Sequence, residues 1–154
     1  MQVETQKITL STEEDSRAFA QAVAPVLQAG DVVLLEGDIG AGKTFFARAL
    51  IQQRLGRLED VPSPTFTIVQ TYPVQDIEIW HCDLYRLTSP DEAIELGLDE
   101  AFEEAICLIE WPDRLGDLTP KGALKLHFSA GENAYSVTLS MPQAWHRRLE
   151  QVLG

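Results

Sequence analysis

The sequence predicts an α/β fold in which a mostly parallel sheet is flanked by helices and has antiparallel strands added to it. Two short apolar runs, at residues 32–35 and 105–109, have the continuous character of buried parallel strands. Helical patterns at residues 12–28 and 45–55 accompany them. Alternating segments on either side of Gly131 predict a terminal hairpin, which supplies antiparallel strands.

Local signals place the other elements of the first half. Residues 3–10 are expected to form a strand. Ser11 and Glu14 have the spacing of a capping box, so Ser11 is expected to cap the first helix. Pro25 is expected to bend or end that helix, and Gly56 is suited to the position after the end of the second helix.

In the second half, residues 67–72 and 76–82 alternate in polarity and predict a hairpin or meander with its turn near residues 73–75. Ser89 and Pro90 indicate a helix start, with the serine as cap and the proline in the first turn. The chain is expected to end in a short helix over residues 145–153.

Composition limits the classes of protein to consider. A chain of 154 residues suits one domain covering residues 1–154. It carries 12 basic and 24 acidic residues, a net charge of −12, which disfavours direct binding of tRNA or DNA. Residues 91–104 hold seven acids and no base. This run is expected to be a solvated face, and a docking surface for a basic partner is the alternative.

The chain is expected to be cytoplasmic. No apolar run approaches the roughly 18 residues of a membrane span, and residues 1–10 contain no apolar signal core. Cys82 and Cys107 lie in apolar segments and are expected to be buried, unpaired thiols. The three histidines lack metal-site spacing with the cysteines, so zinc is not predicted.

The motif with the most chemical content is G-x-x-x-x-G-K-T at residues 37–44, between a predicted strand and a predicted helix. This context predicts a phosphate-binding loop and a P-loop NTPase-like fold that binds a nucleoside triphosphate together with Mg²⁺. Lys43 is expected to reach the β- and γ-phosphates, and the Thr44 hydroxyl to ligate Mg²⁺. The other residues expected to contact the phosphates are Asp38, Ile39, Gly40, Ala41 and Gly42.

A phosphate loop needs acidic partners at the ends of neighbouring strands. Asp83 and Glu110 both follow apolar strand-like runs, and either can hold Mg²⁺ while the other orients the attacking water. Thr65, on a loop between prolines, is either a sensor of the γ-phosphate or a plain loop residue. Trp111 either packs on the nucleotide or a partner, or fills the rim. Arg114 and Arg86 are further candidates for charge neutralisation.

Four segments together resemble a known family: G-D-I-G-A-G-K-T at 37–44, S-P-T-F at 63–66, H-C-D-L-Y-R-L at 81–87 and I-C-L-I-E-W-P at 106–112. The chain is similar to the TsaE (YjeE) family of ATPases in tRNA threonylcarbamoyladenosine biosynthesis. The resemblance implies weak ATP hydrolysis alone and a cycle driven together with TsaD and TsaB. It implies that tRNA is contacted only through that complex.

By position, the resemblance gives Lys43 and Thr44 the phosphate and Mg²⁺ roles and assigns Thr65 to a switch loop. It places Asp83 and Glu110 near Mg²⁺ and water. Trp111 corresponds to the family's tryptophan at the strand tip, and the catalytic set is therefore Asp83, Glu110, Thr65 and Trp111.

Three alternatives remain open. A small-molecule kinase on the same scaffold would carry an Arg-rich lid, and the arginines here are scattered. A GTP switch would need N-K-x-D, whereas Asn133 is followed by Ala134. A nucleotide-gated binding module would depend on the bound state more than on turnover. The segment from Thr9 to Thr12 is the expected neighbour of the adenine.

Overall fold

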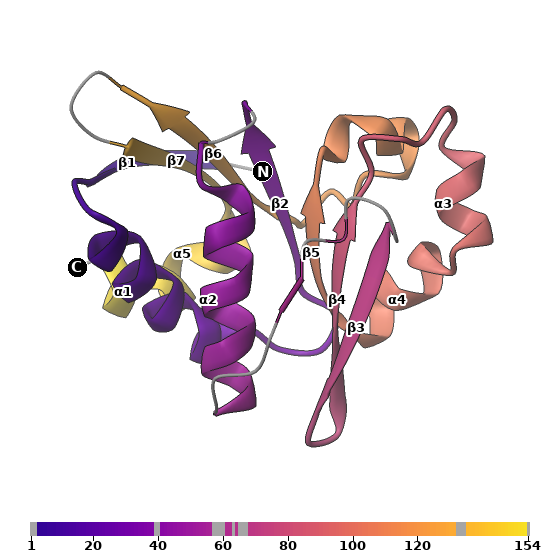
Figure 1. Ribbon diagram of the computed structural model, residues 1–154, viewed down its shortest axis with the longest axis horizontal. Helices are drawn as coiled ribbons and strands as arrows, with labels where there is room; N and C mark the ends of the chain where they lie inside the picture. Colours follow the sequence, from indigo (N-terminus) through magenta and orange to yellow (C-terminus); the bar gives the residue numbers. More distant parts are fainter. Residues whose placement is uncertain are drawn as a thin grey trace.

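The protein is built around one seven-stranded sheet with the strand order β1-β7-β6-β2-β5-β4-β3. The computed structural model describes residues 3–38, 41–56, 61–62, 64, 68–131 and 135–153. Figure 1 shows the sheet running through the molecule with helices on both sides. Its strands are β1 (Val3–Leu10), β2 (Val32–Gly37), β3 (Val69–Val74), β4 (Ile77–Asp83), β5 (Ile106–Glu110), β6 (Leu124–Ala130) and β7 (Tyr135–Pro142).

The centre of the sheet is parallel and its edges are antiparallel. Strands β6, β2, β5 and β4 pair in parallel. The pairs β1–β7, β6–β7 and β3–β4 are antiparallel. The predicted α/β class with a parallel core is therefore confirmed, and the antiparallel additions lie at both edges. Because these four neighbouring strands run in parallel, their carboxyl ends meet at one edge of the sheet.

The helices are α1 (Glu13–Val23), α2 (Lys43–Leu55), α3 (Asp91–Glu95), α4 (Leu98–Glu104) and α5 (Gln143–Leu153), with short 3-10 helices η1 (Ala24–Val26) and η2 (Pro112–Leu118). Helices α1, α2 and α5 cover one face of the sheet, and α3, α4 and η2 lie on the other. In the part of the chain that the structure describes, no helix is long and apolar enough to cross a membrane.

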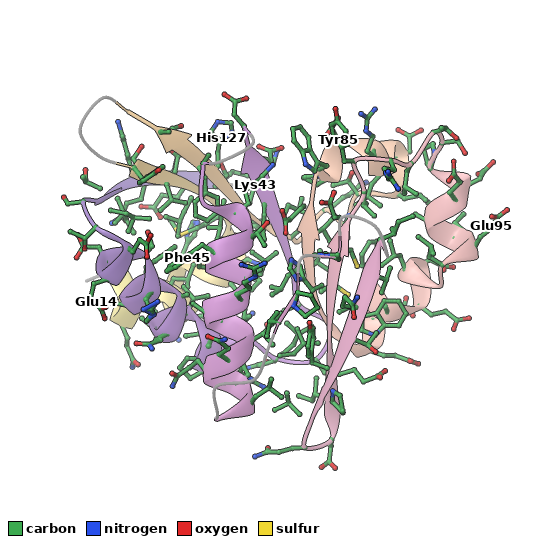
Figure 2. The ribbon with its side chains drawn as sticks, viewed as in Figure 1. Glu14, Lys43, Phe45, Tyr85, Glu95 and His127 are labelled. Carbon is green, nitrogen blue, oxygen red and sulfur yellow. The ribbon has the colours of Figure 1, made fainter. Side chains whose placement is uncertain are left out.

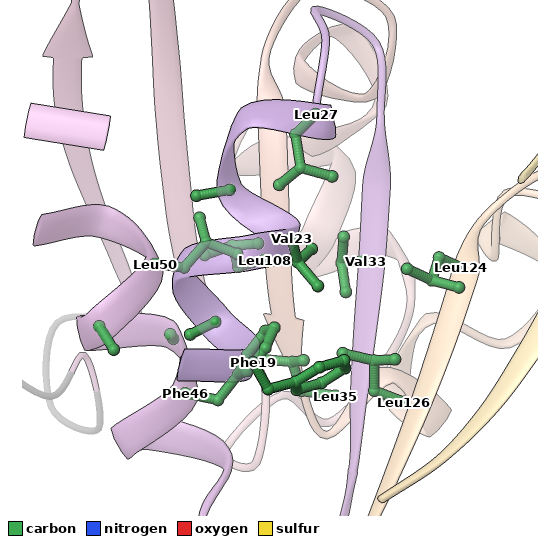
Figure 3. Close-up of a cluster of buried hydrophobic side chains, with 14 of the residues drawn as sticks. Phe19, Val23, Leu27, Val33, Leu35, Phe46, Leu50, Leu108, Leu124 and Leu126 are labelled. Carbon is green, nitrogen blue, oxygen red and sulfur yellow. The ribbon is translucent and has the colours of Figure 1, made fainter. Parts of the chain in front are cut away.

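Alternation along the central strands explains the two layers. In β2, Val33 and Leu35 point into the cluster beneath α1 and α2, whereas Val32 and Leu34 join the opposite cluster. Figure 3 shows the first cluster, in which Phe19 and Val23 of α1 meet Phe46 and Leu50 of α2 above the sheet. Both faces of β2 and β5 are thus apolar, which is why their sequences are continuous apolar runs.

The first helix is shorter than its sequence pattern predicts, and its cap lies one residue later. The Thr12 hydroxyl accepts a hydrogen bond from the Asp15 amide at 3.1 Å, and the Ser11 amide donates to the Asp15 carboxylate at 2.9 Å. The capping box therefore runs from Thr12 to Asp15, rather than from Ser11 to Glu14. The α-helix stops at Val23, because the proline two residues later lacks the amide hydrogen that would continue the ladder.

Two other boundaries also differ from prediction. The β3–β4 hairpin pairs Val74 with Ile77, so its turn is Gln75-Asp76 and not residues 73–75. The helix expected from Ser89 begins with Pro90 as its cap, although the Ser89 carbonyl does accept from the Glu92 amide at 3.2 Å. The C-terminal hairpin and the helix end at Gly56 agree with expectation, and the expected last helix is present but begins two residues earlier, at Gln143.

The two cysteines are buried and unpaired, as expected. Burial raises the pKa of the Cys107 thiol from 9.0 to about 12, and burial also raises that of Cys82 well above its usual value. We predict that neither thiol reacts with Ellman's reagent near neutral pH, whereas both react in denaturant. Rapid labelling of one thiol per molecule of native protein would contradict the burial of the two cysteines.

The same shift predicts a pH dependence of stability. Between pH 9.0 and about 12 the native Cys107 thiol keeps its proton while the unfolded chain releases it. The free energy of unfolding should therefore fall as pH rises through this window. Urea titrations of wild type and Cys107→Ala test this, because the fall should be smaller in the variant.

Candidate functional site

The phosphate loop starts where β2 ends against β6. Gly37 has φ of +131°, and a Cβ there would come within 2.3 Å of the Phe128 carbonyl oxygen. Gly42, at φ +109°, immediately precedes α2. Only glycine takes up both backbone conformations without strain, which accounts for these two glycines of the motif. Phe128 fills the sheet side of the loop and packs on Phe46 at 5.5 Å between ring centroids.

Gly37→Ala is predicted to destabilise the protein by more than the cost of the backbone angle alone. Positive φ costs a residue with a Cβ about 1–2 kcal/mol, and the contact with the Phe128 backbone adds to it. Gly56→Ala is the matched control, because Gly56 has φ +74° and nothing within 4 Å of the added Cβ. Equal losses of unfolding free energy in urea would show that the close approach to Phe128 is not real.

The start of α2 offers its amides to the pocket. Among the described residues, no side chain caps this helix. The first amides of a helix lack intrahelical acceptors, and the helix dipole adds positive potential at the same end. This geometry suits an anion such as a phosphate.

Lys43 supplies the positive charge at this helix start. It is 5% exposed, its Nζ donates to the Gly37 carbonyl oxygen at 2.7 Å, and it lies 3.7 Å from the centroid of the Trp111 ring. Burial lowers the pKa of Lys43, whereas the carboxylates of Glu110, Asp83, Asp38 and Asp113 oppose that shift. The ammonium is thus held by a carbonyl and an aromatic face, among acids that favour its charged form.

Asp83 and Glu110 lie side by side at the carboxyl ends of β4 and β5. The parallel register pairs their Cα positions, and Leu35 of β2 pairs with Glu110 on the other side. Glu110 is 2% exposed and accepts from the Thr44 hydroxyl at 2.9 and 3.2 Å. The Asp83 carboxylate accepts from the Tyr85 amide at 3.0 Å. Two acids and the threonine therefore converge at the loop.

The carboxylate of Glu110 has a second partner in His81, which is fully buried. The His81 Nε2 lies 2.7 Å from Glu110 Oε2. His81 precedes Asp83 by two positions in β4, so both side chains emerge on the face covered by α2. Its Nδ1 is buried and has no hydrogen-bond partner among the described residues.

Trp111 follows Glu110 in a left-handed conformation, φ 59° and ψ 54°, which is unusual for a residue with a large side chain. This turn brings the indole over Lys43 and against Tyr85, with ring centroids 5.0 Å apart. The Arg114 guanidinium lies 5.7 Å from the Tyr85 ring. A pair of aromatic rings with a cation at each end, in the order Lys43, Trp111, Tyr85 and Arg114, therefore closes one side of the loop. Figure 2 shows Lys43 at the N-terminal end of α2 and Tyr85 on the other side of the strand ends.

Lys43, Thr44, Asp83, Glu110, Tyr85 and Trp111 line a cavity of about 530 Å³. Its volume is that of a ligand site for a small molecule. The phosphate-loop end is formed by Lys43 and Thr44 together with the two strand-tip acids. Toward α1 and β7 the wall consists of Glu13, Ser16, Phe45 and Tyr135.

The predicted site residues can now be placed. The cavity brings together Ala41, Gly42, Lys43, Thr44, Asp83, Glu110 and Trp111. Asp38 is exposed and is not among the lining residues, although its carboxylate acts on the charge of Lys43. Ile39, Gly40 and Thr65 lie outside the described residues, so their predicted roles stay predictions.

Several lining residues were not predicted. Tyr135 enters because β7 pairs with β1, and Glu13 and Ser16 because α1 follows β1 directly. No local motif marks them. The segment from Thr9 to Thr12, which was expected to lie beside the adenine, ends one residue before Glu13, the first residue of this wall. For His81 a signal existed, since alternation along the strand places it on the same side as Asp83.

The donor set is compatible with Mg²⁺ in one particular way. Among the described residues, no group of three histidine, cysteine or acidic side chains is placed to hold a metal ion alone. The site instead offers the Thr44 hydroxyl and one or two carboxylates, all hard oxygen donors. Mg²⁺ is commonly held by one or two carboxylates together with substrate phosphates and water. The residues therefore fit a metal that arrives with a polyphosphate.

Comparison with known proteins gives a consistent result. The family model described as "Threonylcarbamoyl adenosine biosynthesis protein TsaE" matches residues 10–137. Proteins named tRNA threonylcarbamoyladenosine biosynthesis protein TsaE are similar: one from Rickettsia bellii is 42% identical over 82% of this chain and 88% of its own length. One from Bacillus subtilis is 37% identical over 82% of this chain and 80% of its own length. The crystal structure of Bacillus subtilis YdiB superposes with a TM-score of 0.82 at 30% identity, covering 99% of this chain and 96% of that one.

Proposed function

Because the chain belongs to the TsaE family of tRNA threonylcarbamoyladenosine biosynthesis proteins, we propose that it is an ATPase that binds ATP together with Mg²⁺. In this proposal hydrolysis is slow in the isolated protein and drives the cycle of a cytoplasmic TsaD–TsaB complex. The observation that carries the proposal is the convergence of Lys43, the Thr44–Glu110 pair and Asp83 in one cavity.

In our assignment the phosphates occupy the loop and the start of α2. The ammonium of Lys43 exchanges its contact with the Gly37 carbonyl for the β- and γ-phosphate oxygens. The amides at the start of α2 hold the same oxygens. Trp111, which packs on that ammonium, holds the lysine side chain in place beside the phosphates.

Glu110 is assigned to the metal and Asp83 to the water. The Thr44 hydroxyl gives its hydrogen to Glu110, so its lone pairs are left for a cation. Glu110 and Thr44 would therefore hold Mg²⁺ as one pair, and the ion would supply positive charge beside the phosphates. We assign to Asp83, one strand further on, the hydrogen bond from the water that attacks the γ-phosphorus, as the bond to the bridging oxygen breaks and ADP leaves.

The charge of the molecule supports action through a protein partner. The net charge is −12, and six of the seven acids in the segment from α3 to α4 are exposed. Figure 2 shows Glu95 projecting from α3 on the outer side of the molecule. Such a surface repels the tRNA backbone and favours a basic protein surface. In our proposal tRNA is contacted only indirectly, through the complex.

Isothermal titration calorimetry of the purified protein tests the proposal. ATP with Mg²⁺ should bind more tightly than GTP with Mg²⁺, and ADP release should be faster when purified TsaD and TsaB are present. Absence of binding to any purine triphosphate, both alone and with the two partners, would refute it. A phosphorylated metabolite formed in stoichiometric amounts would instead identify a kinase.

A further inference from the structure

His81 is a polar residue in an apolar place. It is fully buried at the base of the site, below Asp83 on β4. Below the acids, its neighbours on this face of the sheet are Ile79, which precedes it by two positions, and Leu108, its partner on β5; Gln70 is its partner on β3. An apolar side chain would fill this position without exposing a polar ring to a dry interior. The histidine therefore needs a role that its volume does not explain.

The hydrogen bonds of the ring fix its tautomer. Glu110 in its ionised form only accepts hydrogen bonds, so the short contact of 2.7 Å requires the hydrogen on His81 Nε2. The His81 Nδ1 has no partner among the described residues, and a bare lone pair there is less costly than an unsatisfied N–H. The ring thus acts as a one-sided donor aimed at Glu110.

Glu110 passes this constraint on to Thr44. Its Oε2 receives the imidazole N–H, and both of its oxygens lie within 3.2 Å of the Thr44 hydroxyl oxygen. The contact from His81 and the two contacts with Thr44 together restrain the carboxylate of Glu110, to which the Thr44 hydroxyl donates. The lone pairs of that hydroxyl then point away from Glu110, toward the cavity.

We propose that His81 is a positioning residue: its Nε2–H holds the Glu110 carboxylate so that Glu110 and Thr44 are preorganised for Mg²⁺. This inference rests on the proposed function, because it assigns the metal to Glu110 and Thr44. It adds a residue that touches neither nucleotide nor metal. Partners of this kind, which orient a metal-binding carboxylate, typically change metal affinity or activity by about 10–100-fold when removed.

Two amide substitutions of different length distinguish a residue that positions Glu110 from one that only fills space. His81→Gln places its N–H near the position of Nε2, whereas His81→Asn places it near Nδ1, out of reach of Glu110. We expect His81→Asn to raise the Mg²⁺ concentration for half-maximal hydrolysis by about 10–100-fold, and His81→Gln to keep most of the wild-type Mg²⁺ affinity. Binding of ATP in EDTA should be unchanged in both variants. His146→Asn, on α5, should behave as wild type.

A second measurement needs neither a variant of His81 nor hydrolysis. Long-range ¹H–¹⁵N correlation spectra of the wild-type protein report which ring nitrogen carries hydrogen, and His127→Asn and His146→Asn assign the other two histidines. We expect the Nε2–H tautomer for His81. The Nδ1–H tautomer would overturn the proposal, and so would equal Mg²⁺ requirements in His81→Asn and His81→Gln. If wild type failed to bind ATP, the proposed function would fall, while the tautomer would still report on the His81–Glu110 contact.

Discussion

Lys43→Ala is expected to abolish measurable ATP binding and to lower hydrolysis by at least about 10²–10³-fold, the usual effect of losing one preorganised charge-stabilising group. The reason is that Lys43 carries the ammonium group placed beside the loop, only 5% exposed, at 2.7 Å from the Gly37 carbonyl. Calorimetry with ATP and a phosphate-release assay measure the two effects.

Lys125→Ala is the matched control for this change. Lys125 lies on β6 with a side chain that is 45% exposed, and it forms a surface ion pair with Glu36 at 3.7 Å. We expect wild-type ATP binding in this variant. Lys43→Ala should remain folded, because burial lowers the pKa of Lys43 and so works against its charge in the native state. Unimpaired ATP binding by a folded Lys43→Ala protein would place the triphosphate elsewhere.

The parts of the site that were predictable from sequence are those carried by local patterns. The apolar runs that become β2 and β5 are buried on both faces, so continuity alone identified them. Parallel strands end at one edge, and this rule brings Glu110 to the phosphate loop without any knowledge of contacts. The glycine positions of the motif follow from backbone conformations that the structure shows at Gly37 and Gly42.

The remaining parts depend on pairings that are distant in sequence. Tyr135 lines the cavity only because β7 lies between β1 and β6, an order that no local motif encodes. The cap of the first helix was displaced because Thr12 and Asp15 compete with Ser11 and Glu14 at the same spacing. From the sequence, His81 was considered only as a metal ligand. The role proposed for it depends on its contact with Glu110, which lies on the neighbouring strand β5.

Glu110 and Asp83 lie in equivalent positions on adjacent strands. Their roles are therefore tested with variants that remove the negative charge of each side chain and keep its size. Glu110→Gln can keep an oxygen at the position of Oε2, which accepts from both Thr44 and His81. Asp83→Asn preserves the acceptor for the Tyr85 amide. Each variant therefore removes one negative charge while leaving a side chain of the same size.

We expect Glu110→Gln to raise the Mg²⁺ requirement of hydrolysis and lower its rate by about 10²–10³-fold, while ATP still binds in EDTA. Asp83→Asn should keep a nearly wild-type Mg²⁺ requirement and lose about 10²–10⁴-fold in rate, as expected for a residue that orients or activates water. Phosphate release measured across a range of Mg²⁺ concentrations distinguishes the two. The reverse pattern would exchange the two roles, and a raised Mg²⁺ requirement in both variants would show that the acids share the metal.

The same two variants decide whether turnover or the bound state matters for the partner complex. Both are expected to bind ATP, because Lys43 and the amides of α2 are unchanged. If hydrolysis resets the complex, modification of tRNA by TsaD and TsaB should stop after about one round with either variant, although association with the complex persists. Sustained modification with a protein that binds ATP without hydrolysing it would mean that nucleotide occupancy alone gates the partner. In that case the two strand-tip carboxylates would serve to retain Mg²⁺ and ATP, rather than to cleave the phosphate.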